Sequence, residues 1–397
     1  MVDDDPTGSR PGPLLSGLRV LDLSLWQPGH TATQLLADLG ADVIKVEPPG
    51  GDRMRPLADR FANYNGHKRS VVLDLKDDGD RALFLGLVTS VEVVVENYRP
   101  GVADRLGVGF GALREANPAV VVCSISGFGQ TGPLAGATGH DANYQAWAGA
   151  FTLRDGLEPV PSALLVGDQG SGMAAAFAIL AAVLCARRTG EGEHVDVSMA
   201  DVLASWVAPM GPLGPTHGPG DGPGDGPGPV AASTGEASDT PAATARPGPA
   251  LGTFLTGDGL WVVLGVFSED HFWDELCRAL GLDGQVGLTM AQRVADTDAL
   301  HRRVATAVAG WERDRLIELL TARAVPAAPV LSRSEMLRHP HFQARGVLAT
   351  SPEGRVTIGH PVSYTVHPIR PAGPAPALDE HGDELLGRRR AAPGSRG

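Results

Sequence analysis

Residues 17–47 read GLRVLDLSLWQPGHTATQLLADLGADVIKVE and contain two strand patterns on either side of a helix pattern. The apolar runs at 18–25 and 42–47 have the length and composition of buried strands. Residues 31–39 have helical spacing, and Gly40 ends them as glycine commonly ends a helix. Short buried strands joined by a helix predict parallel pairing, so this stretch indicates an α/β fold.

The same alternation continues along the chain. Further strands are predicted at 70–75, 91–95 and 119–126, with a helix at 78–88. We therefore expect a large Rossmann-like domain built on a parallel sheet. Its first strand–helix turn reads WQPGH at 26–30, without Gly-x-Gly-x-x-Gly, so dinucleotide binding of the usual kind is not indicated.

The composition is typical of a soluble globular protein. The 397 residues are 43% hydrophobic and 20% charged, with a formal net charge of −13, which gives no electrostatic support for nucleic-acid binding. Three widely spaced cysteines without a Cys-x-x-Cys pair favour a reducing cytoplasmic location. The histidines form no recognisable metal set, so we expect no metal. The longest apolar run, 173–185, is shorter than the ~20 residues of a membrane helix, so we expect no membrane partner.

Shifts in composition divide the chain into segments. The Gly-, Pro- and Asp-rich repeats near 218–227 bury too little apolar surface to fold. A hairpin pattern follows at 252–265, because Asp-Gly between apolar runs signals a turn, and then helix patterns follow. The predicted segments are a disordered tail at 1–13, a large Rossmann-like domain at 14–207, a linker at 208–250, a small α+β domain at 251–345, a return segment to the large domain at 346–371, and a flexible tail at 372–397.

Asp168 stands out among the polar residues. It lies in ALLVGDQGSGM, residues 163–173, between an apolar run and a glycine-spaced turn that precedes a long alanine-rich helix pattern. Glycines allow close approach to the backbone, so a ligand could reach this carboxylate. An aspartate before a helix is also a usual N-cap, which accepts backbone N–H bonds. From these residues alone, ligand contact and helix capping are both open.

Several segments, taken in order, resemble the class III CoA-transferase family, which also includes alpha-methylacyl-CoA racemases and carnitine CoA-transferases. The segments that resemble it are GLRVLDL (17–23), LADLGADVIKVEPP (36–49), NGHKRS (65–70), ENYRPG (96–101), SGFGQTGP (126–133) and GHDANY (139–144). The likeness extends from about residue 15 to about residue 365 and is interrupted by the linker. Its strength lies in the order and number of these segments.

The resemblance implies an architecture and a set of partners. The family fold is a Rossmann-like large domain joined by linkers to a smaller domain, and two chains interlock as a homodimer. Coenzyme A, carried as an acyl-CoA, is expected as a substrate together with a carboxylic acid. CoA binding and catalysis are expected in the large domain, 14–207.

Asp168 matches the family's catalytic aspartate. Such a carboxylate can attack an acyl-CoA thioester to give a mixed anhydride, and the CoA thiolate then returns to give an aspartyl-CoA thioester, which an incoming carboxylic acid resolves. Gln27, in the predicted loop after the first strand, matches a glutamine that transferases often carry near the thioester. Its amide could stabilise the oxyanion of acyl transfer, and a solvated loop position is the alternative.

His140 leaves a second activity open. In the racemases a Gly-His-Asp-x-Asn-Tyr segment supplies a catalytic histidine, and a later aspartate completes an acid/base pair that moves the α-proton. His140 and Asp168 hold these two positions, although His140 could instead line the pocket. The sequence QGSGM after Asp168 favours a transferase over a racemase. An acyl-CoA-binding scaffold without turnover is a third alternative, and the retained Asp168 argues against it.

Six residues are predicted to contact CoA. The resemblance places contacts in the segment 97–105, and cations near predicted strand ends lie where open α/β sheets bind ligands. The six are Asn97, Tyr98, Arg99, Arg105, Lys68 and Arg69. For each cation, a solvated surface position is the alternative, because exposed lysines and arginines are common.

Overall fold

The computed structural model describes residues 12–152, 158–210, 248–350, 356–367, 369–371 and 373–387. These residues form two compact units. The first comprises the described residues up to 210 together with those from 340 onward, and the second comprises 248–339. The predicted tail at 1–13 and linker at 208–250 lie mostly outside the described residues.

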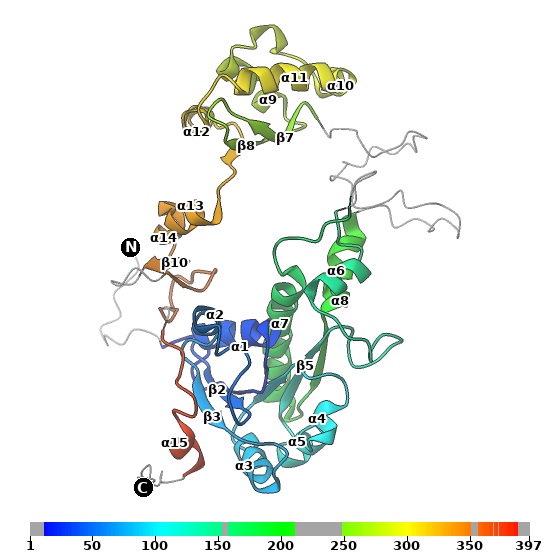
Figure 1. The fold of residues 1–397 in the computed structure, drawn as a ribbon, viewed down its shortest axis with the longest axis vertical. Helices are drawn as coiled ribbons and strands as arrows, with labels where there is room; N and C mark the ends of the chain where they lie inside the picture. The colour runs from blue at the N-terminus through cyan, green and yellow to red at the C-terminus, as the bar shows by residue number, and fades with distance from the viewer. Residues whose placement is uncertain are drawn as a thin grey trace. The chain divides into compact units, whose positions relative to one another are not determined.

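A six-stranded parallel sheet organises the first unit (Figure 1). Its strands are β1 (Arg19–Asp22), β2 (Asp42–Glu47), β3 (Arg69–Val72), β4 (Val93–Glu96), β5 (Val121–Ser126) and β6 (His194–Ser198), in the order β3-β2-β1-β4-β5-β6. From β1 the sheet continues to one side through β2 and β3 and to the other through β4, β5 and β6. Both neighbours of β1, β2 and β4, pair with it in parallel. The predicted α/β class with a parallel Rossmann-like sheet is confirmed.

Helices cover both faces of this sheet. They are α1 (Gln27–Asp38), α2 (Ala58–Tyr64), α3 (Asp78–Val88), α4 (Val102–Arg105), α5 (Phe110–Ala116), α6 (Asp141–Trp147), α7 (Val166–Thr189) and α8 (Met199–Val207), followed by a short 3-10 turn, η1 (Ala208–Met210). Side chains alternate between faces along a strand, so Val93 and Val95 of β4 pack with α1, α7 and α8, whereas Val94 packs with α3 and α5. The sheet is therefore buried on both faces, as its apolar strands require.

Helix α7 is the longest helix among the described residues, with 24 residues. The apolar run at 173–185 was expected to be too short to cross a membrane. That expectation is wrong, because the glycine-spaced turn at 167–172 is already helical and lengthens the helix. By length and composition alone, α7 passes as a membrane span. Half of its most apolar window is buried in the protein, and its buried side chains belong to the same core cluster as those of α1 and β5.

The C-terminal segment returns to the edge of the sheet. Two short strands, β10 (Leu348–Thr350) and β11 (Val356–Ile358), follow α14 (Pro340–Ala344), and α15 (Gly382–Leu386) ends the described chain. The prediction of a flexible tail from 372 onward is wrong for 373–387. The amide of His381 donates to the Ser70 carbonyl (2.9 Å), and the Val72 amide donates to the Asp379 carboxylate (2.9 Å).

The second unit is a small α+β fold. Its antiparallel sheet contains β7 (Ala250–Leu255), β8 (Trp261–Val266) and β9 (Ala327–Pro329) in that order. Its helices are α9 (Asp270–Leu280), η2 (Asp283–Gln285), α10 (Met290–Ala295), α11 (Thr297–Val308), α12 (Arg313–Ala322) and α13 (Arg333–Arg338). The predicted hairpin pairs β7 with β8, and the apolar faces of α9, α11 and α12 cover the sheet.

Candidate active site at the start of helix α7

Three glycines let the first turns of α7 approach three other helices closely. A Cβ atom on Gly167 would lie 2.9 Å from the Asp141 carboxylate in α6, and one on Gly170 would overlap the ring of Trp206 in α8. Gly172 faces α1 in the same way. A glycine inside a helix costs about 1 kcal/mol relative to alanine, so close packing is the physical reason for placing three of them here.

Asp141 holds the beginning of α7. Its Oδ1 accepts the backbone N–H of Asp168 (2.9 Å), and its Oδ2 accepts a hydrogen bond from the amide of Gln145. The N-cap alternative for Asp168 is wrong: the N-cap position is Leu165, and Asp168 lies inside the first turn. A carboxylate from another helix therefore satisfies a free N–H of α7, and this leaves the Asp168 side chain available.

The Asp168 carboxylate is half-buried, and no described residue hydrogen-bonds to it. Burial and, to a smaller extent, the nearby Asp141 carboxylate together raise the pKa of Asp168 to about 6, against the opposing charge of Arg60. A carboxyl group with this pKa is mostly ionised at neutral pH and is more basic than an ordinary aspartate. Asp168 therefore presents a carboxylate to which no described residue donates a hydrogen bond and which is available to a ligand.

Gln169 connects the site to α1 and α2. Its Nε2 donates to the hydroxyl of Tyr64 (2.6 Å), and its Oε1 accepts a longer bond from Thr31 (3.4 Å). Sequence reasoning missed Tyr64 and Arg60 of α2, as well as Asp141, because nothing in the local pattern connects them to Asp168. The glycine-spaced turn was the one available signal, since it predicted close contacts without naming the partners.

Gln27 lies at the first position of α1. The prediction of a loop at 26–30 is wrong, because α1 begins four residues earlier than expected, with Pro28 in its first turn, where proline is favoured. Gln27 is only 6% exposed, so the solvated-loop alternative is also wrong. No described residue hydrogen-bonds to its side-chain amide. Thr31 lies one turn later on the same helical face and contacts Gln169, so Gln27 faces the start of α7.

His140 directly precedes α6 and occupies its N-cap position. Its backbone N–H donates to the Asn143 side chain (2.9 Å), and its side chain is exposed. The next residue, Asp141, is bonded to the Asp168 amide, so the structure brings His140 to the same end of α7. In the same helix, the buried ring of Tyr144 lies edge-on to the ring of Phe128. A role for His140 in proton transfer stays a prediction.

Comparison with known proteins identifies the family. A family model described as CoA-transferase family III matches residues 15–382. The chain belongs to this family. Family membership supports CoA transfer as the reaction, with an acyl-CoA as a substrate.

Two curated relatives and one solved structure are similar to this CoA-transferase over nearly their whole length. Succinate–glutarate CoA-transferase from Agrobacterium fabrum is 33% identical, covering 94% of this chain and 95% of the relative. Succinyl-CoA:mesaconate CoA-transferase from Haloarcula hispanica is 34% identical, with the same coverage of 94% and 95%. The crystal structure of a CAIB/BAIF family protein from Brucella suis has a TM-score of 0.80 at 28% identity, covering 95% of this chain and 99% of that one.

Four of the predicted CoA contacts follow the carboxyl end of β4. Asn97 and Tyr98 are half-buried, whereas Arg99 and Arg105 are exposed. The Asn97 Oδ1 accepts the N–H of Leu25 (3.0 Å), which ties the segment before α1 to β4. This position agrees with the strand-end argument, since ligands of open α/β sheets bind beyond the carboxyl ends. The CoA contacts themselves stay predictions.

Lys68 and Arg69 lie at the other end of their strand, because both precede or begin β3. The Lys68 ammonium is fully buried and donates to Asp22 (2.9 Å), with Thr33 and Asn65 as its other acceptors. A ligand could reach it only by displacing one of these three partners. The Arg69 guanidinium is paired with Asp42 and Glu384. The strand-end argument is therefore wrong for these two residues.

The buried charges instead fix the segment that leads into α1. Asp22 accepts the backbone N–H of Ser24 (2.9 Å), and Lys45 donates to the Ser24 carbonyl (2.7 Å) while pairing with Asp52 (2.7 Å). Burial acts to raise the pKa of Asp22, yet the ammoniums of Lys68 and Lys45 hold it well below the usual range. Because these buried ion pairs bind the backbone of Ser24, they fix the segment that ends at Gln27.

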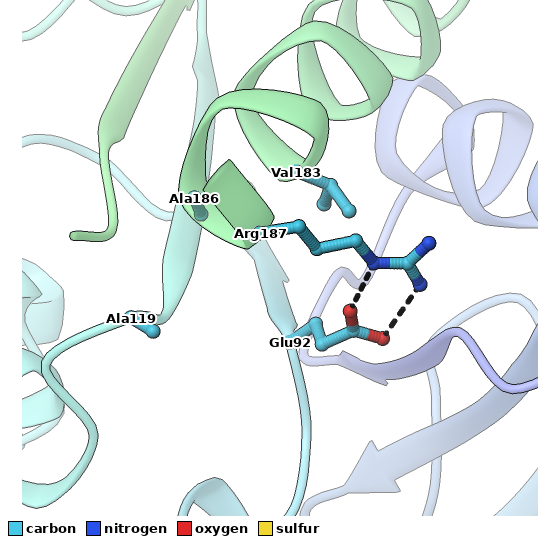
Figure 2. A pocket seen from close by; sticks show the side chains of 5 residues that line it. All are labelled: Glu92, Ala119, Val183, Ala186 and Arg187. Carbon is cyan, nitrogen blue, oxygen red and sulfur yellow. Dashed lines mark hydrogen bonds and ion pairs between the residues drawn. The ribbon is translucent and has the colours of Figure 1, made fainter. Parts of the chain in front are cut away.

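A separate pocket lies at the opposite end of α7 (Figure 2). It is lined by Glu92, Ala119, Val183, Ala186 and Arg187. Arg187 donates to both carboxylate oxygens of Glu92, at 2.7 and 3.3 Å, so its charged groups already have partners. At 1.5 Å per residue, Arg187 lies roughly 28 Å along the helix from Asp168, and the pocket takes no part in the site.

Substituting Gly172 tests the close packing of α7 on α1. A Cβ atom there would lie 2.6 Å from the Thr31 Cβ and 2.8 Å from the Pro28 carbonyl oxygen. We expect Gly172→Ala to lower the free energy of unfolding by about 1–3 kcal/mol and to reduce turnover, because the helix start must shift. Gly86→Ala in α3 is the matched control, since its Cβ meets nothing within 4 Å and should stabilise by about 0.5–1 kcal/mol. Equal effects of the two changes in urea unfolding would contradict this packing.

Replacing Asp168 should stabilise the protein in a pH-dependent way. Because its folded pKa of about 6 lies above the usual 3.8, ionisation costs stability as pH rises through this window, and the cost is complete above it. We expect Asp168→Asn to raise the free energy of unfolding by about 1–2 kcal/mol at pH 8, after allowance for partial exposure, and by almost nothing at pH 3.5. Thermal unfolding across this range measures it, and a difference independent of pH would be inconsistent with the raised pKa.

Proposed function

We propose that Asp168 is the nucleophile of this CoA-transferase and that its acceptors are dicarboxylic acids. The observation that supports the first part is the free, mostly ionised carboxylate of Asp168 at a helix start packed through glycines. The second part rests on the two curated relatives, whose names specify succinate, glutarate and mesaconate. All three of these acids carry two carboxyl groups.

The proposed exchange proceeds through Asp168 without a net change in protonation. An Asp168 oxygen attacks the thioester carbon, the C–S bond breaks, and CoA leaves as a thiolate while a mixed anhydride remains. The thiolate attacks the side-chain carbonyl of Asp168, releases the donor as a carboxylate and leaves an aspartyl-CoA thioester. The acceptor carboxylate attacks this thioester, its C–S bond breaks, and a second anhydride forms as CoA leaves again as a thiolate. The thiolate then attacks the acceptor's carbonyl, which gives the new acyl-CoA and restores Asp168.

The surroundings of Asp168 suit the charges that develop in these steps. Each attack places negative charge on a carbonyl oxygen, and donors fixed in advance stabilise it most effectively. Gln27 offers a buried amide with no protein hydrogen-bond partner among the described residues, on the α1 face that meets the start of α7. We assign Gln27 this donor role. The positive end of α7 adds a favourable field for an anionic intermediate.

CoA exchange between carboxylates needs no proton transfer from carbon, so His140 is not required to act as a base. Racemisation would require two groups on opposite sides of the α-carbon, each holding a proton in turn. The exposed side chain of His140 fits a residue that lines the site without taking a proton. This difference between the two reactions provides a direct test.

Trapping experiments can identify the nucleophile. With acyl-CoA alone, borohydride should reduce the aspartyl-CoA thioester, and peptide mass spectrometry should locate the change at Asp168 in the wild type but not in Asp168→Asn. The variant should bind CoA and lose turnover by at least ~10⁴-fold, as expected for a lost nucleophile. In deuterated water, the acyl α-hydrogen should not exchange, and exchange that depends on His140 would overturn the transferase mechanism.

We also propose that the enzyme is a homodimer. Met173, Phe177 and Leu184 of α7 are 58%, 77% and 69% exposed, and they lie within roughly 60° of one another around the helix. A row of exposed large apolar side chains along a core helix is typical of a surface that another chain covers.

The homodimer predicts a native mass near twice the 41.2 kDa of one chain. Phe177→Lys should lower the share of dimer in native mass spectrometry because it places a charge within the apolar stripe. Arg302→Lys on the exposed face of α11 serves as a control that preserves charge. A wild-type protein that remains monomeric at micromolar concentration would disprove the proposal.

A further inference from the structure

Arg60 is the cation whose positive charge opposes the rise in the pKa of Asp168. It also opposes the rise that burial causes in the pKa of Tyr64. The geometry of α2 agrees, because Arg60 and Tyr64 are four residues apart and so share one face of the helix. The Tyr64 hydroxyl on this face accepts the bond from Gln169, the neighbour of Asp168. The face of α2 that carries Arg60 is therefore turned toward the nucleophile.

Arg60 also differs from Arg55, the arginine five residues before it. Arg55 is bound to the Glu47 carboxylate and stacks over the ring of Phe61, with 4.4 Å between the guanidinium carbon and the ring centroid. Arg60 is exposed, and among the described residues it has no hydrogen bond or ion pair. An arginine beside a reactive carboxylate that is left without a partner is available for an anionic ligand.

The charges at the site make such a cation necessary for a substrate with two carboxylates. Asp168 and Asp141 already place two negative groups at the start of α7. An acceptor brings one carboxylate to the reacting carbon, and a second carboxylate would add further repulsion unless a positive group receives it. A guanidinium binds a carboxylate through two parallel N–H···O bonds, which fixes both position and orientation.

We propose that Arg60 binds the second, non-reacting carboxylate of a dicarboxylic acid and thereby selects dicarboxylic over monocarboxylic acceptors. This inference rests on the proposed function, because it assumes an acceptor that reacts at Asp168. Tyr64 is a positioning residue in this arrangement: through Gln169 it holds α2 against the start of α7 and so keeps Arg60 within reach of the acceptor.

Matched acceptors test the selection. With acetyl-CoA as the donor, which has no second carboxylate, kcat/KM is measured for succinate against butyrate and for glutarate against pentanoate. We expect Arg60→Gln to lower kcat/KM for both dicarboxylic acids by about 10- to 100-fold, as for loss of a hydrogen-bonded charge pair, mainly through KM. The values for the two monocarboxylic acids should change by less than about twofold on the same reasoning. Arg60→Lys keeps the charge and should recover part of the loss.

Two controls separate the possible failures. Assays at pH 8.5 keep Asp168 ionised in every variant, so a shift of its pKa in Arg60→Gln does not affect the comparison. Arg303→Gln removes an exposed arginine from α11 and should leave kcat/KM unchanged for all four acceptors. An equal loss for succinate and butyrate, or no loss for either, overturns the role of Arg60 while CoA transfer stands. A wild-type enzyme that transfers CoA to no carboxylic acid overturns the proposed function, and the inference with it.

Discussion

The hydrogen bond from the Asp168 amide to the Asp141 carboxylate joins the two helices on which the site depends. A helix start leaves backbone N–H groups without partners, and one of them is satisfied here from α6 rather than from α7 itself. The same carboxylate would lie 2.9 Å from a Cβ atom on Gly167, so a side chain there would push it from its position. One acidic group thus holds the helix start, favours a glycine beside it and helps to raise the pKa of Asp168.

The segment before α1, on the other side of the α1–α7 contact, is held by charges that are buried completely. Lys45 and Lys68 place two ammonium groups beside Asp22 and Asp52, beneath the segment that enters α1. Such pairs pay a large desolvation cost and add little net stability, but they tolerate few other arrangements. Their effect is therefore one of orientation: they define where α1 begins, and so where Gln27 lies relative to α7. Removing one partner alone would leave a buried charge without compensation.

Much of the fold follows from local pattern, whereas the site follows from contacts that pattern does not record. Buried strands and the Asp-Gly hairpin were predictable because their apolar runs are short and clearly bounded. The starts of α1 and α7 were misplaced, since proline and glycine usually mark turns, and here both lie inside helices. The strand β6 was missed because its edge position leaves its first residues partly exposed. Asp168 was identifiable from its neighbours in sequence. Asp141, Tyr64 and Arg60 come near the start of α7 only through tertiary packing, which local sequence patterns do not record.

The return of the C-terminal segment to β3 affects more than the boundary of a domain. β3 is an edge strand, and the N–H and C=O groups of Ser70 and the N–H group of Val72 are paired with residues 379–381 of the same chain. An edge strand without such cover offers a template on which a second molecule can add a strand. Residues 379–381 therefore occupy backbone groups of β3 to which a second strand would otherwise bind. A chain shortened before residue 373 would lose this cover together with the packing of Leu385 and Leu386 against the core, so truncation in this region should lower both stability and solubility.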